Sequence, residues 1–293
     1  MMTAAPPSPP ESVPAQDPAR RGGRPARPQL TLTVVRREQL GPHLVRVVLG
    51  GDRFDEFATT EATDAYVKIV FAKPELGLVP PYDLAALRES GLAAADLPVT
   101  RTYTVRTVDP VARELSIDFV VHGDEGLAGP WANAAQPGDT LTFSGPGGAY
   151  APDPAADWHL FAGDLSALPA IAAAIDALPR TALGLAFIEA TAENDALVLD
   201  APAGVTVQWL FTGGGHRARL AEAVSSAEWL PGRPQVFAHG ERDAMKALRD
   251  VFAQRGVLRS ELSLSGYWAA GRTEDRFQAE KREPIGAIEP VSD

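Results

Sequence analysis

The hexapeptide RTYTVR, residues 101–106, gathers the side chains in this sequence best suited to binding chemistry. A strand alternates its side chains, so one face would carry Arg101, Tyr103 and Val105 and the opposite face two threonines and a second arginine. An ordinary half-buried strand alternates apolar with polar residues, and this one does not. A planar anionic ligand lying along the strand would explain the pattern. On the hexapeptide alone, a surface strand with solvated arginines explains it equally well.

Composition removes several other kinds of chemistry. The chain has 293 residues, a formal net charge of -11 and a pI of about 5.0, which disfavours binding to nucleic acid or to anionic lipid. It has no cysteine, so disulfides, thiolate metal sites and iron–sulfur clusters are excluded. Its five histidines show no metal-ligand spacing, and we expect no metal site. Any redox chemistry therefore needs a bound organic cofactor.

The ends and the hydropathy pattern indicate where the protein works. No apolar run reaches the 18 residues that a membrane span needs, and the N-terminus lacks the apolar stretch of a secretory signal. We therefore expect a cytoplasmic protein without membrane insertion. Residues 1–28 are rich in Pro, Ala, Gly and Arg and predict a disordered tail.

Residues 29–152 read as β structure. Runs rich in Val, Leu, Ile and Thr are separated by turn residues and predict six strands, at 30–38, 43–51, 64–72, 100–109, 113–123 and 139–146. Six strands with short gaps predict a closed antiparallel barrel. Two segments interrupt it: an excursion over 74–98 with a short helix at 83–90, and a helix at 126–135. Pro130 fits only the first turn of that second helix.

Residues 153–293 change to an alternation of strands and helices. The predicted strands are 158–164, 182–190, 205–211, 235–241 and 261–268. The predicted helices are 166–178, 216–226 and 242–256, with a further helix at the C-terminus. This alternation predicts a parallel sheet covered on both faces, so the chain is expected to be an all-β domain followed by an α/β domain.

Six motifs, in this order, resemble the siderophore-interacting protein family of the ferredoxin-reductase-like flavoproteins. They are RTYTVR, IDFVVHGDEGLAGPWA, PGDTLTFSGPGGAY, WHLFAGDLSALPAI, FAHGERDAMKALR and SGYWAAGRTED. The resemblance implies FAD on the barrel, NADPH or NADH on the second domain, and a ferric siderophore as substrate. It implies hydride transfer to the flavin N5 and then single-electron transfer to Fe(III), which releases Fe(II).

The resemblance gives the hexapeptide specific roles. Arg101 would neutralise the flavin pyrophosphate, because a guanidinium can bond two oxygens at once. Tyr103 would lie against the isoalloxazine, and Thr104 would present its hydroxyl to the N5 edge through a twist or bulge; these two are the catalytic candidates. Arg106 would be a second phosphate or ribityl contact. Thr102 completes this set of cofactor contacts.

Two further barrel segments are implied to touch the cofactor. The strand IDFVVHG would run beside it, through Asp118, Val120 and His122. The helix that begins in GLAGPWA would direct its first N–H groups at the pyrophosphate. Its candidate residues are Ala128, Gly129, Pro130 and Trp131, with packing inside the helix favoured over stacking for Trp131. Relatives often have Ser at position 129, so only backbone donors are expected here.

The second domain is implied to bind the nicotinamide cosubstrate at the carboxyl ends of its strands. The turn after the first strand supplies Gly163, Asp164, Ser166 and Ala167, and the motif HGE supplies His239, Gly240 and Glu241. A GxGxxG fingerprint is absent, which disfavours a dehydrogenase-type domain. Tyr267 or Trp268 would cover one flavin face until nicotinamide displaces it.

The contacts to the phosphates and to the siderophore are more open. Arg217 and Arg219 either bind the 2′-phosphate of NADPH or are solvated at a helix start. Relatives often carry basic residues at positions 269 and 270, where this chain has alanine. Arg272 and either Lys68 or Lys73 are the substitutes considered for binding an anionic siderophore.

Two alternatives to a siderophore reductase remain at this point. A flavoreductase of the same architecture would pass electrons to a protein acceptor such as ferredoxin. A non-enzymatic siderophore-binding module would hold no flavin. The expected state is a monomer, and the sequence leaves open the siderophore and the choice between NADH and NADPH.

Overall fold

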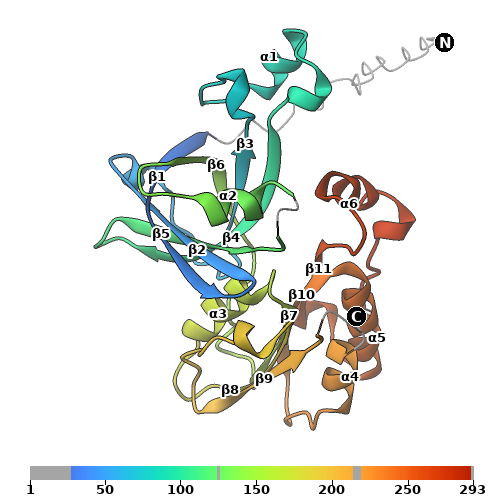
Figure 1. Ribbon diagram of the computed structural model, residues 1–293. Helices are drawn as coiled ribbons and strands as arrows, with labels where there is room; N and C mark the ends of the chain where they lie inside the picture. The colour runs from blue at the N-terminus through green and yellow to red at the C-terminus, as the bar shows by residue number, and fades with distance from the viewer. Residues whose placement is uncertain (1–27, 124–125, 214–218, 292–293) are drawn as a thin grey trace, which may run out of the picture.

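The computed structural model describes residues 28–123, 126–213 and 219–291. It has two parts in contact, a barrel formed by the first half of the chain and a sheet flanked by helices formed by the second half (Figure 1). Nearly all of the tail expected at residues 1–28 lies outside the described residues.

The barrel confirms the six predicted antiparallel strands. They are β1 (Gln29–Gly41), β2 (Leu44–Gly50), β3 (Tyr66–Phe71), β4 (Val99–Asp109), β5 (Glu114–Val120) and β6 (Thr140–Gly147), closed in the order β1-β2-β5-β4-β3-β6. Alternation decides which face is buried: Leu30, Leu32 and Val34 of β1 point into the core, and Thr31 and Thr33 between them are less buried. A short 3-10 helix, η1 (Phe54–Glu56), follows β2.

The ladder between β4 and β5 is incomplete. The two strands are paired from Asp109–Glu114 to Val105–Ile117, with a register shift between Val105 and Thr107. Beyond that point, β4 continues back to Val99 paired only with β3, and β5 continues to Val120 paired only with β2. We call this parting, between residues 101–104 of β4 and 118–120 of β5, the open seam.

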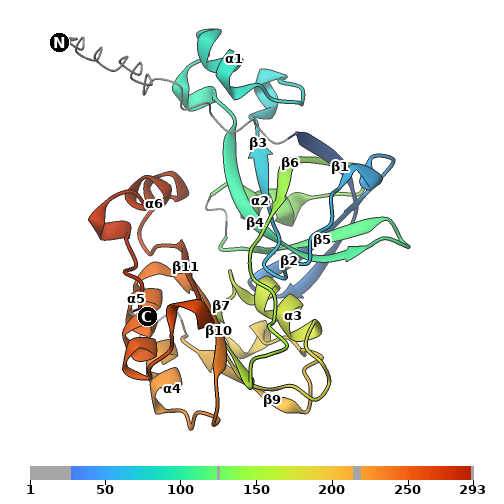
Figure 2. The same ribbon diagram turned by 180° about the vertical axis from the view of Figure 1, so that it is seen from behind.

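The two predicted interruptions lie at opposite places on the barrel. The excursion contains η2 (Pro74–Leu76), α1 (Leu84–Glu89) and η3 (Ala94–Asp96), and both views place α1 at the end of the barrel far from the sheet (Figures 1 and 2). α2 (Ala128–Ala134) packs against β2 and β5, with Pro130 in its first turn. The Trp131 ring lies 5.7 Å from Phe119 and 6.1 Å from Phe71, so α2 fills one end of the barrel core.

The second half confirms the predicted parallel sheet. Its strands are β7 (Trp158–Asp164), β8 (Leu183–Ala190), β9 (Gly204–Phe211), β10 (Pro234–Glu241) and β11 (Leu262–Trp268), in the order β11-β10-β7-β8-β9. α3 (Leu168–Asp176) covers one face together with the barrel, and α4 (Arg219–Ser226) and α5 (Arg242–Gln254) cover the other. The strand order reverses between β7 and β10, where such sheets bind ligands outside their carboxyl ends.

The chain ends in α6 (Glu274–Glu280), which returns toward the barrel after β11. Glu280 is fully buried, and its carboxylate accepts hydrogen bonds from Arg242 at 2.6 Å and from Arg272 and Arg276 at 2.8 Å each. These guanidinium groups, Arg242 first, lower the pKa of Glu280 to about 2. Three remaining 3-10 turns are η4 (Glu193–Asp195), η5 (Arg259–Glu261) and η6 (Pro284–Gly286). Among the described helices, none combines the length and apolarity that crossing a membrane would require.

Side chains fasten the two halves together. Asp195 is fully buried in η4, and its carboxylate accepts from the backbone N–H of His43 at 3.1 Å and contacts His43 Nδ1 at 2.9 Å. Asp64 accepts from the backbone N–H groups of Ala149 and Tyr150, in the connection between the halves. The carboxyl ends of the parallel strands are therefore held facing the barrel.

Candidate functional site

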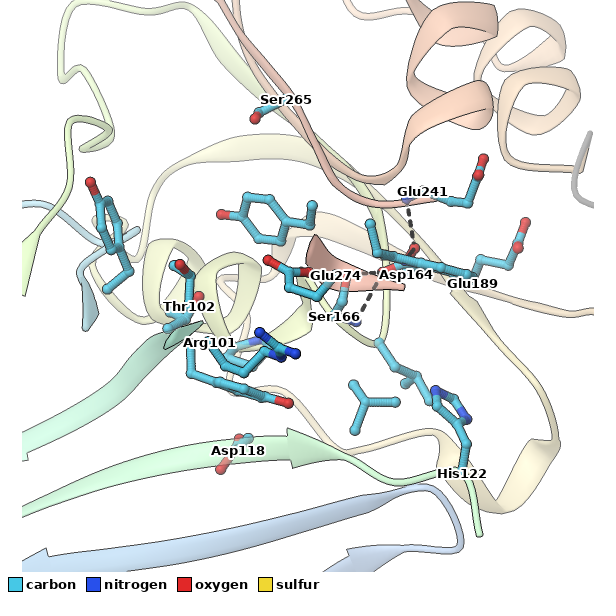
Figure 3. Close-up of a pocket in the computed structure, with 18 of the residues that line it drawn as sticks. Arg101, Thr102, Asp118, His122, Asp164, Ser166, Glu189, Glu241, Ser265 and Glu274 are labelled. Carbon is cyan, nitrogen blue, oxygen red and sulfur yellow. Dashed lines mark hydrogen bonds between the residues drawn. The ribbon is translucent and has the colours of Figure 1, made fainter. Parts of the chain in front are cut away.

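A cavity of about 780 Å³ lies between the open seam and the carboxyl ends of the parallel strands. Its wall includes residues of β3, β4 and β5 from the barrel, of β7, β8, β10 and β11 from the sheet, and of α6 (Figure 3). The structure brings together twelve of the predicted site residues in this wall. They are Arg101, Thr102, Tyr103, Thr104, Asp118, Val120, His122, Asp164, Ser166, Glu241, Tyr267 and Trp268.

The hexapeptide that opened the sequence argument contributes four consecutive residues. Residues 101–104 all line the cavity, although a strand points alternate side chains to opposite faces. The reason is the open seam: the cavity meets β4 at its edge, so side chains from both faces reach it. The sequence led us to expect a twist or bulge that turns Thr104 inward, and a register shift does occur beside it, between Val105 and Thr107.

Two side chains of this edge combine charge with an aromatic surface. The Arg101 side chain is 17% exposed, and its guanidinium lies 3.1 Å from Asp275 of α6 and donates to the carbonyl of Thr100. The Tyr103 ring packs 4.5 Å from the Phe119 ring, centroid to centroid, and burial raises the pKa of Tyr103 to about 12. The edge thus offers a cation and a neutral phenol ring side by side.

Thr104 lies where the barrel meets the sheet. It is buried, and both it and Tyr267 at the end of β11 line the cavity, where the Thr104 side chain partly opposes the rise in the pKa of Tyr267. Burial raises the pKa of Tyr267 well above its usual range, so this phenol stays protonated. A hydroxyl pair therefore lies in the cavity wall where the two halves meet.

Asp118, on the other side of the open seam, is paired with an arginine side chain. Its carboxylate accepts two hydrogen bonds from Arg46 of β2, at 2.7 and 2.8 Å, in a bidentate pair. The carboxyl side chain is 2% exposed. The pair neutralises an acid in the cavity wall, where an unpaired carboxylate would repel an anionic ligand.

Acidic side chains cluster at the carboxyl ends of the strands. The Asp164 carboxylate accepts from the backbone N–H of Ser166 and of Glu241, each at 2.9 Å, and from the indole N–H of Trp268 at 2.8 Å. Figure 3 shows Asp164 between Ser166 and Glu241. The Glu241 carboxylate in turn accepts from the first N–H groups of α5 and from Ala270. Both acids thus organise the turns around them.

Ten of the predicted site residues do not line the cavity. They are Arg106, Ala128, Gly129, Pro130, Trp131, Gly163, Ala167, Arg219, His239 and Gly240. Arg217 lies outside the described residues. Ion pairing, side-chain packing and close backbone contact explain why these residues lie away from the cavity.

Among the barrel residues, pairing and packing account for the difference. Arg106 forms an ion pair of 2.7 Å with Asp176 at the end of α3, so it joins the two halves instead of facing the cavity. Ala128 and Gly129 are buried in α2, and a Cβ on Gly129 would contact the carbonyl of Val120 at 3.4 Å. The start of α2 is therefore packed onto β5.

In the second half, close backbone contact accounts for the two glycines and Ala167. A Cβ on Gly163 would lie 2.5 Å from the carbonyl of His239, and one on Gly240 would lie 2.8 Å from the Asp164 carboxylate. Ala167 is fully buried at the start of α3.

Arg219 donates to the carbonyl of Phe211. His239 is buried, with its Nε2 2.9 Å from Ser263 Oγ and its ring 4.9 Å from that of Tyr267.

Sequence reasoning missed part of the wall. Tyr66, Glu189, Glu274, Gln278 and Lys281 all line the cavity. The last three recur at intervals of four and three residues, so they lie on one face of a helix. This period in the sequence could have predicted that they face the same way. Of the cations considered for an anionic substrate, Lys68 lines the cavity, whereas Lys73 pairs with Asp96 and Arg272 pairs with Glu280.

The arrangement suits a long, partly flat anion. An exposed strand edge offers backbone N–H and C=O groups, Tyr103 offers a ring, and the hydroxyls of Thr102 and Thr104 offer hydrogen bonds. Positive charge comes from Arg101, Lys68 and Lys281. The described residues therefore fit a dinucleotide with an aromatic ring system and phosphates.

Two family models match consecutive parts of the chain. Residues 33–150 match the siderophore-interacting FAD-binding domain, and residues 156–271 match the siderophore-interacting protein model. Among curated proteins, an uncharacterized protein of Mycobacterium tuberculosis is 49% identical over 273 residues, covering 88% of this chain and 96% of its own length.

Two similar proteins carry names that describe an activity. Ferric vibriobactin reductase ViuB of Vibrio cholerae is 32% identical and covers 85% of this chain and 93% of its own length. The NADPH-dependent ferric-chelate reductase of Escherichia coli is 30% identical and covers 82% of this chain and 92% of its own length.

Among solved structures, two siderophore-related proteins are also similar to this chain. A siderophore utilization protein from T. fusca is 36% identical with a TM-score of 0.72, covering 84% of this chain and 94% of its own. The siderophore-interacting protein SipS from Aeromonas hydrophila is 29% identical with a TM-score of 0.74, covering 89% and 99%. A ferredoxin reductase of carbazole 1,9a-dioxygenase shares only the fold, at 17% identity and a TM-score of 0.59, covering 82% and 68%.

The buried His239 generates a prediction about pH. Burial, with a smaller effect of Lys281, lowers the pKa of His239 to about 3, whereas a histidine in the unfolded chain titrates near 6.5. Between these values the unfolded chain binds a proton that the folded chain does not. The free energy of unfolding should therefore fall as the pH drops from 6.5 to 5, by at most about 1.4 kcal/mol per pH unit for this group.

His239→Gln, which carries no charge at any of these pH values, should show a smaller fall. Urea unfolding at pH 6.5, 6 and 5 measures the difference, in a window above the titration of Glu280. The pKa of His159 is also lowered by burial, so some pH dependence should persist in the variant. Equal slopes for the variant and the native chain would contradict the prediction.

Proposed function

The chain belongs to the siderophore-interacting protein family, and from this membership we propose that it is an FAD-dependent reductase that uses NADPH or NADH to reduce ferric siderophores and release Fe(II). The observation that carries the proposal is a cavity lined both by the open seam and by the carboxyl ends of the parallel strands. One cavity bounded by both surfaces allows two ring systems to meet within it. The proposal places the reaction in the cytoplasm.

FAD would be held by the open seam. Arg101 would bind the pyrophosphate, Tyr103 would lie against the isoalloxazine, and the edge of β4 would supply backbone hydrogen bonds. Bound FAD would supply the exchange between a two-electron hydride donor and one-electron ferric acceptors. The protein's part is to fix distance and orientation and to exclude water.

The sheet half of the cavity would receive the nicotinamide cosubstrate. Tyr267 and Trp268 line this half, and the hydroxyl pair of Thr104 and Tyr267 marks where it meets the barrel. The name of the Escherichia coli relative supports NADPH as a donor. Lys68 and Lys281 are the cavity cations that would attract an anionic siderophore, whose iron need not touch any protein atom.

Turnover of the purified full-length chain tests the proposal. The protein should be yellow, with flavin absorption bands, and should form Fe(II) from a ferric siderophore only when NADPH or NADH is present. A Fe(II)-specific chelator records the product. Faster turnover with ferredoxin than with any ferric siderophore would favour the protein-acceptor alternative, and a colourless chain that binds no FAD would exclude both reductases.

Arg101→Ala should weaken FAD binding by about ten- to a hundredfold, because hydrogen bonds between a guanidinium and a phosphate are charge-assisted. Fluorescence quenching of added FAD measures the affinity. Asp275→Asn is the matched control, since it removes the ion-pair partner and keeps the cation. A full flavin complement in the Arg101 variant, or an equal loss in the Asp275 variant, would rule out the phosphate role.

Thr104→Ala should keep FAD and slow the reduction of the flavin by about tenfold, because the hydrogen bond that this hydroxyl would offer to the N5 edge is lost. Stopped-flow absorbance with NADPH and with NADH records the rate. Thr104→Ser retains the hydroxyl and should stay close to the native rate. An unchanged rate in the alanine variant would show that this hydroxyl has no part in the hydride step.

A further inference from the structure

The cavity extends along the carboxyl ends of the parallel strands from one edge of the sheet to the other. Its wall includes Trp268 at the end of β11 and Thr212 just after β9, and these two strands form the opposite edges of the five-stranded sheet. Neighbouring strands lie about 4.8 Å apart, so the distance from β11 to β9 is roughly 19 Å. The strand ends therefore offer room for a dinucleotide that lies across them.

The part of the cavity at β8 and β9 is built by two strand ends that are tied together. Glu189, Ala190, Thr191 and Thr212 line it, and we call these four residues the β8–β9 arm. The backbone N–H of Thr212 donates to the Ala190 carbonyl at 3.0 Å, and that of Gly213 donates to the Thr191 carbonyl at 2.9 Å. One carboxylate and two hydroxyls are thereby brought to the same part of the wall.

Glu189 is placed in this wall by its strand. Ile188 and Ala190, its neighbours in the chain, are buried in the core that includes α3, so strand alternation turns Glu189 to the other face of the sheet. Its partner in register on β7 is Asp164, which also lines the cavity. Figure 3 shows the Glu189 side chain beside the end of its strand, in the same region of the wall as Asp164 and Glu241.

The strand order gives this position a chemical meaning. Numbered from the first strand of the sheet, the order β9-β8-β7-β10-β11 is 3-2-1-4-5. In dinucleotide-binding sheets with this order, an acid one βα unit after the first turn accepts a hydrogen bond from the 2′-hydroxyl of the adenosine ribose. Here the second strand is β8, and Glu189 is its acid. The glycine fingerprint of those sheets is absent, so the assignment rests on the strand order and on the cavity.

The proposed function fixes the direction in which a dinucleotide would lie. Its nicotinamide would meet the flavin near Tyr267 and Trp268, at the β11 side of the cavity. The adenosine half would then lie farther along the strand ends, toward β8 and β9, where the cavity continues. This direction brings the adenosine ribose to the β8–β9 arm.

We propose that Glu189 binds the adenosine ribose of the nicotinamide cosubstrate and thereby selects NADH over NADPH. The proposal rests on the proposed function in taking one of these two dinucleotides as cosubstrate. An ionised carboxylate has about four acceptor positions, so Glu189 can accept from the ribose 2′- and 3′-hydroxyls and also contact the protein. The Escherichia coli relative is named for NADPH, but at 30% identity its name does not decide the cosubstrate of this chain.

The distribution of charge supports the exclusion of NADPH. Its 2′-phosphate would replace a hydroxyl donor with nearly two negative charges beside a carboxylate. The cations among the described residues of the cavity wall are Lys68, Arg101 and Lys281, which belong to the barrel and to α6 and not to β8 or β9. Arg219, considered from the sequence for the 2′-phosphate, donates instead to the Phe211 carbonyl and does not line the cavity.

Binding of two dinucleotide fragments tests the proposal without any turnover. ADP-ribose and 2′-phospho-ADP-ribose differ only in the 2′-phosphate, and both lack the nicotinamide. Calorimetry with the flavin-loaded full-length chain should show that ADP-ribose binds at least about tenfold more tightly. Equal or tighter binding of the 2′-phosphorylated fragment would overturn the proposal, and so would a failure of both fragments to bind.

Two substitutions at position 189 assign the selectivity to this carboxylate. Glu189→Gln keeps the shape and removes the charge, so ADP-ribose should bind about tenfold more weakly and the preference between the fragments should largely disappear. Glu189→Arg should reverse the preference, because a guanidinium binds phosphate. If the arginine variant does not fold, Glu189→Gln carries the test.

Glu193→Gln is the matched control, because it removes one carboxylate from the exposed turn that follows β8, outside the cavity wall. It should keep the native preference between the fragments. A native preference in Glu189→Gln, or an equal loss of preference in Glu193→Gln, would overturn the role of Glu189.

Stopped-flow reduction of the flavin separates this proposal from the function on which it rests. The native chain should be reduced by NADH at least about tenfold more efficiently than by NADPH. Reduction by neither dinucleotide would refute the proposed function itself. Reduction by NADPH as efficient as by NADH, or more so, would leave the reductase standing and refute the selection by Glu189.

Discussion

The site depends on the point at which β4 parts from β5. A buried strand edge needs hydrogen-bond partners, and a barrel normally supplies them by closing its ladder completely. Here the ladder stops at Val105–Ile117, yet the barrel interior stays filled, because Tyr103 packs on Phe119 and Trp131 of α2 packs on the same ring. The core therefore survives the opening. The edges of the two strands become surfaces that a ligand can use.

The opening would be of little use without a fixed opposing surface. The buried Asp195 holds the β1–β2 turn through His43, and Arg106 pairs with Asp176 at the end of α3. These contacts hold the carboxyl ends of the strands opposite the seam. Charge is divided between the two sides: Arg101 and Lys68 come from the barrel, whereas Asp164, Glu189 and Glu241 lie on the sheet side. Two of the three cavity cations therefore come from the barrel, and Lys281 is the third.

Periodicity was sufficient to predict the fold. Period-two runs such as LTLTVV became strands buried on one face, and apolar runs such as WHLFAGD became strands buried on both faces. The site was predicted less completely. Residues 101–104 reached the cavity, but Arg106 on the same strand pairs with α3, since pairing depends on where a distant helix docks. Lys281 and Glu274 were missed for the same reason: their helix is visible in the sequence, but its return over the cavity is not.

A crystal structure of the flavin-loaded chain tests the central claim most directly. The account predicts isoalloxazine density in the open seam, in contact with Tyr103 and Thr104, with Arg101 bonded to phosphate oxygens in place of Asp275. Flavin density elsewhere on the protein would contradict it, as would an Arg101–Asp275 pair left intact beside a seam that holds no flavin.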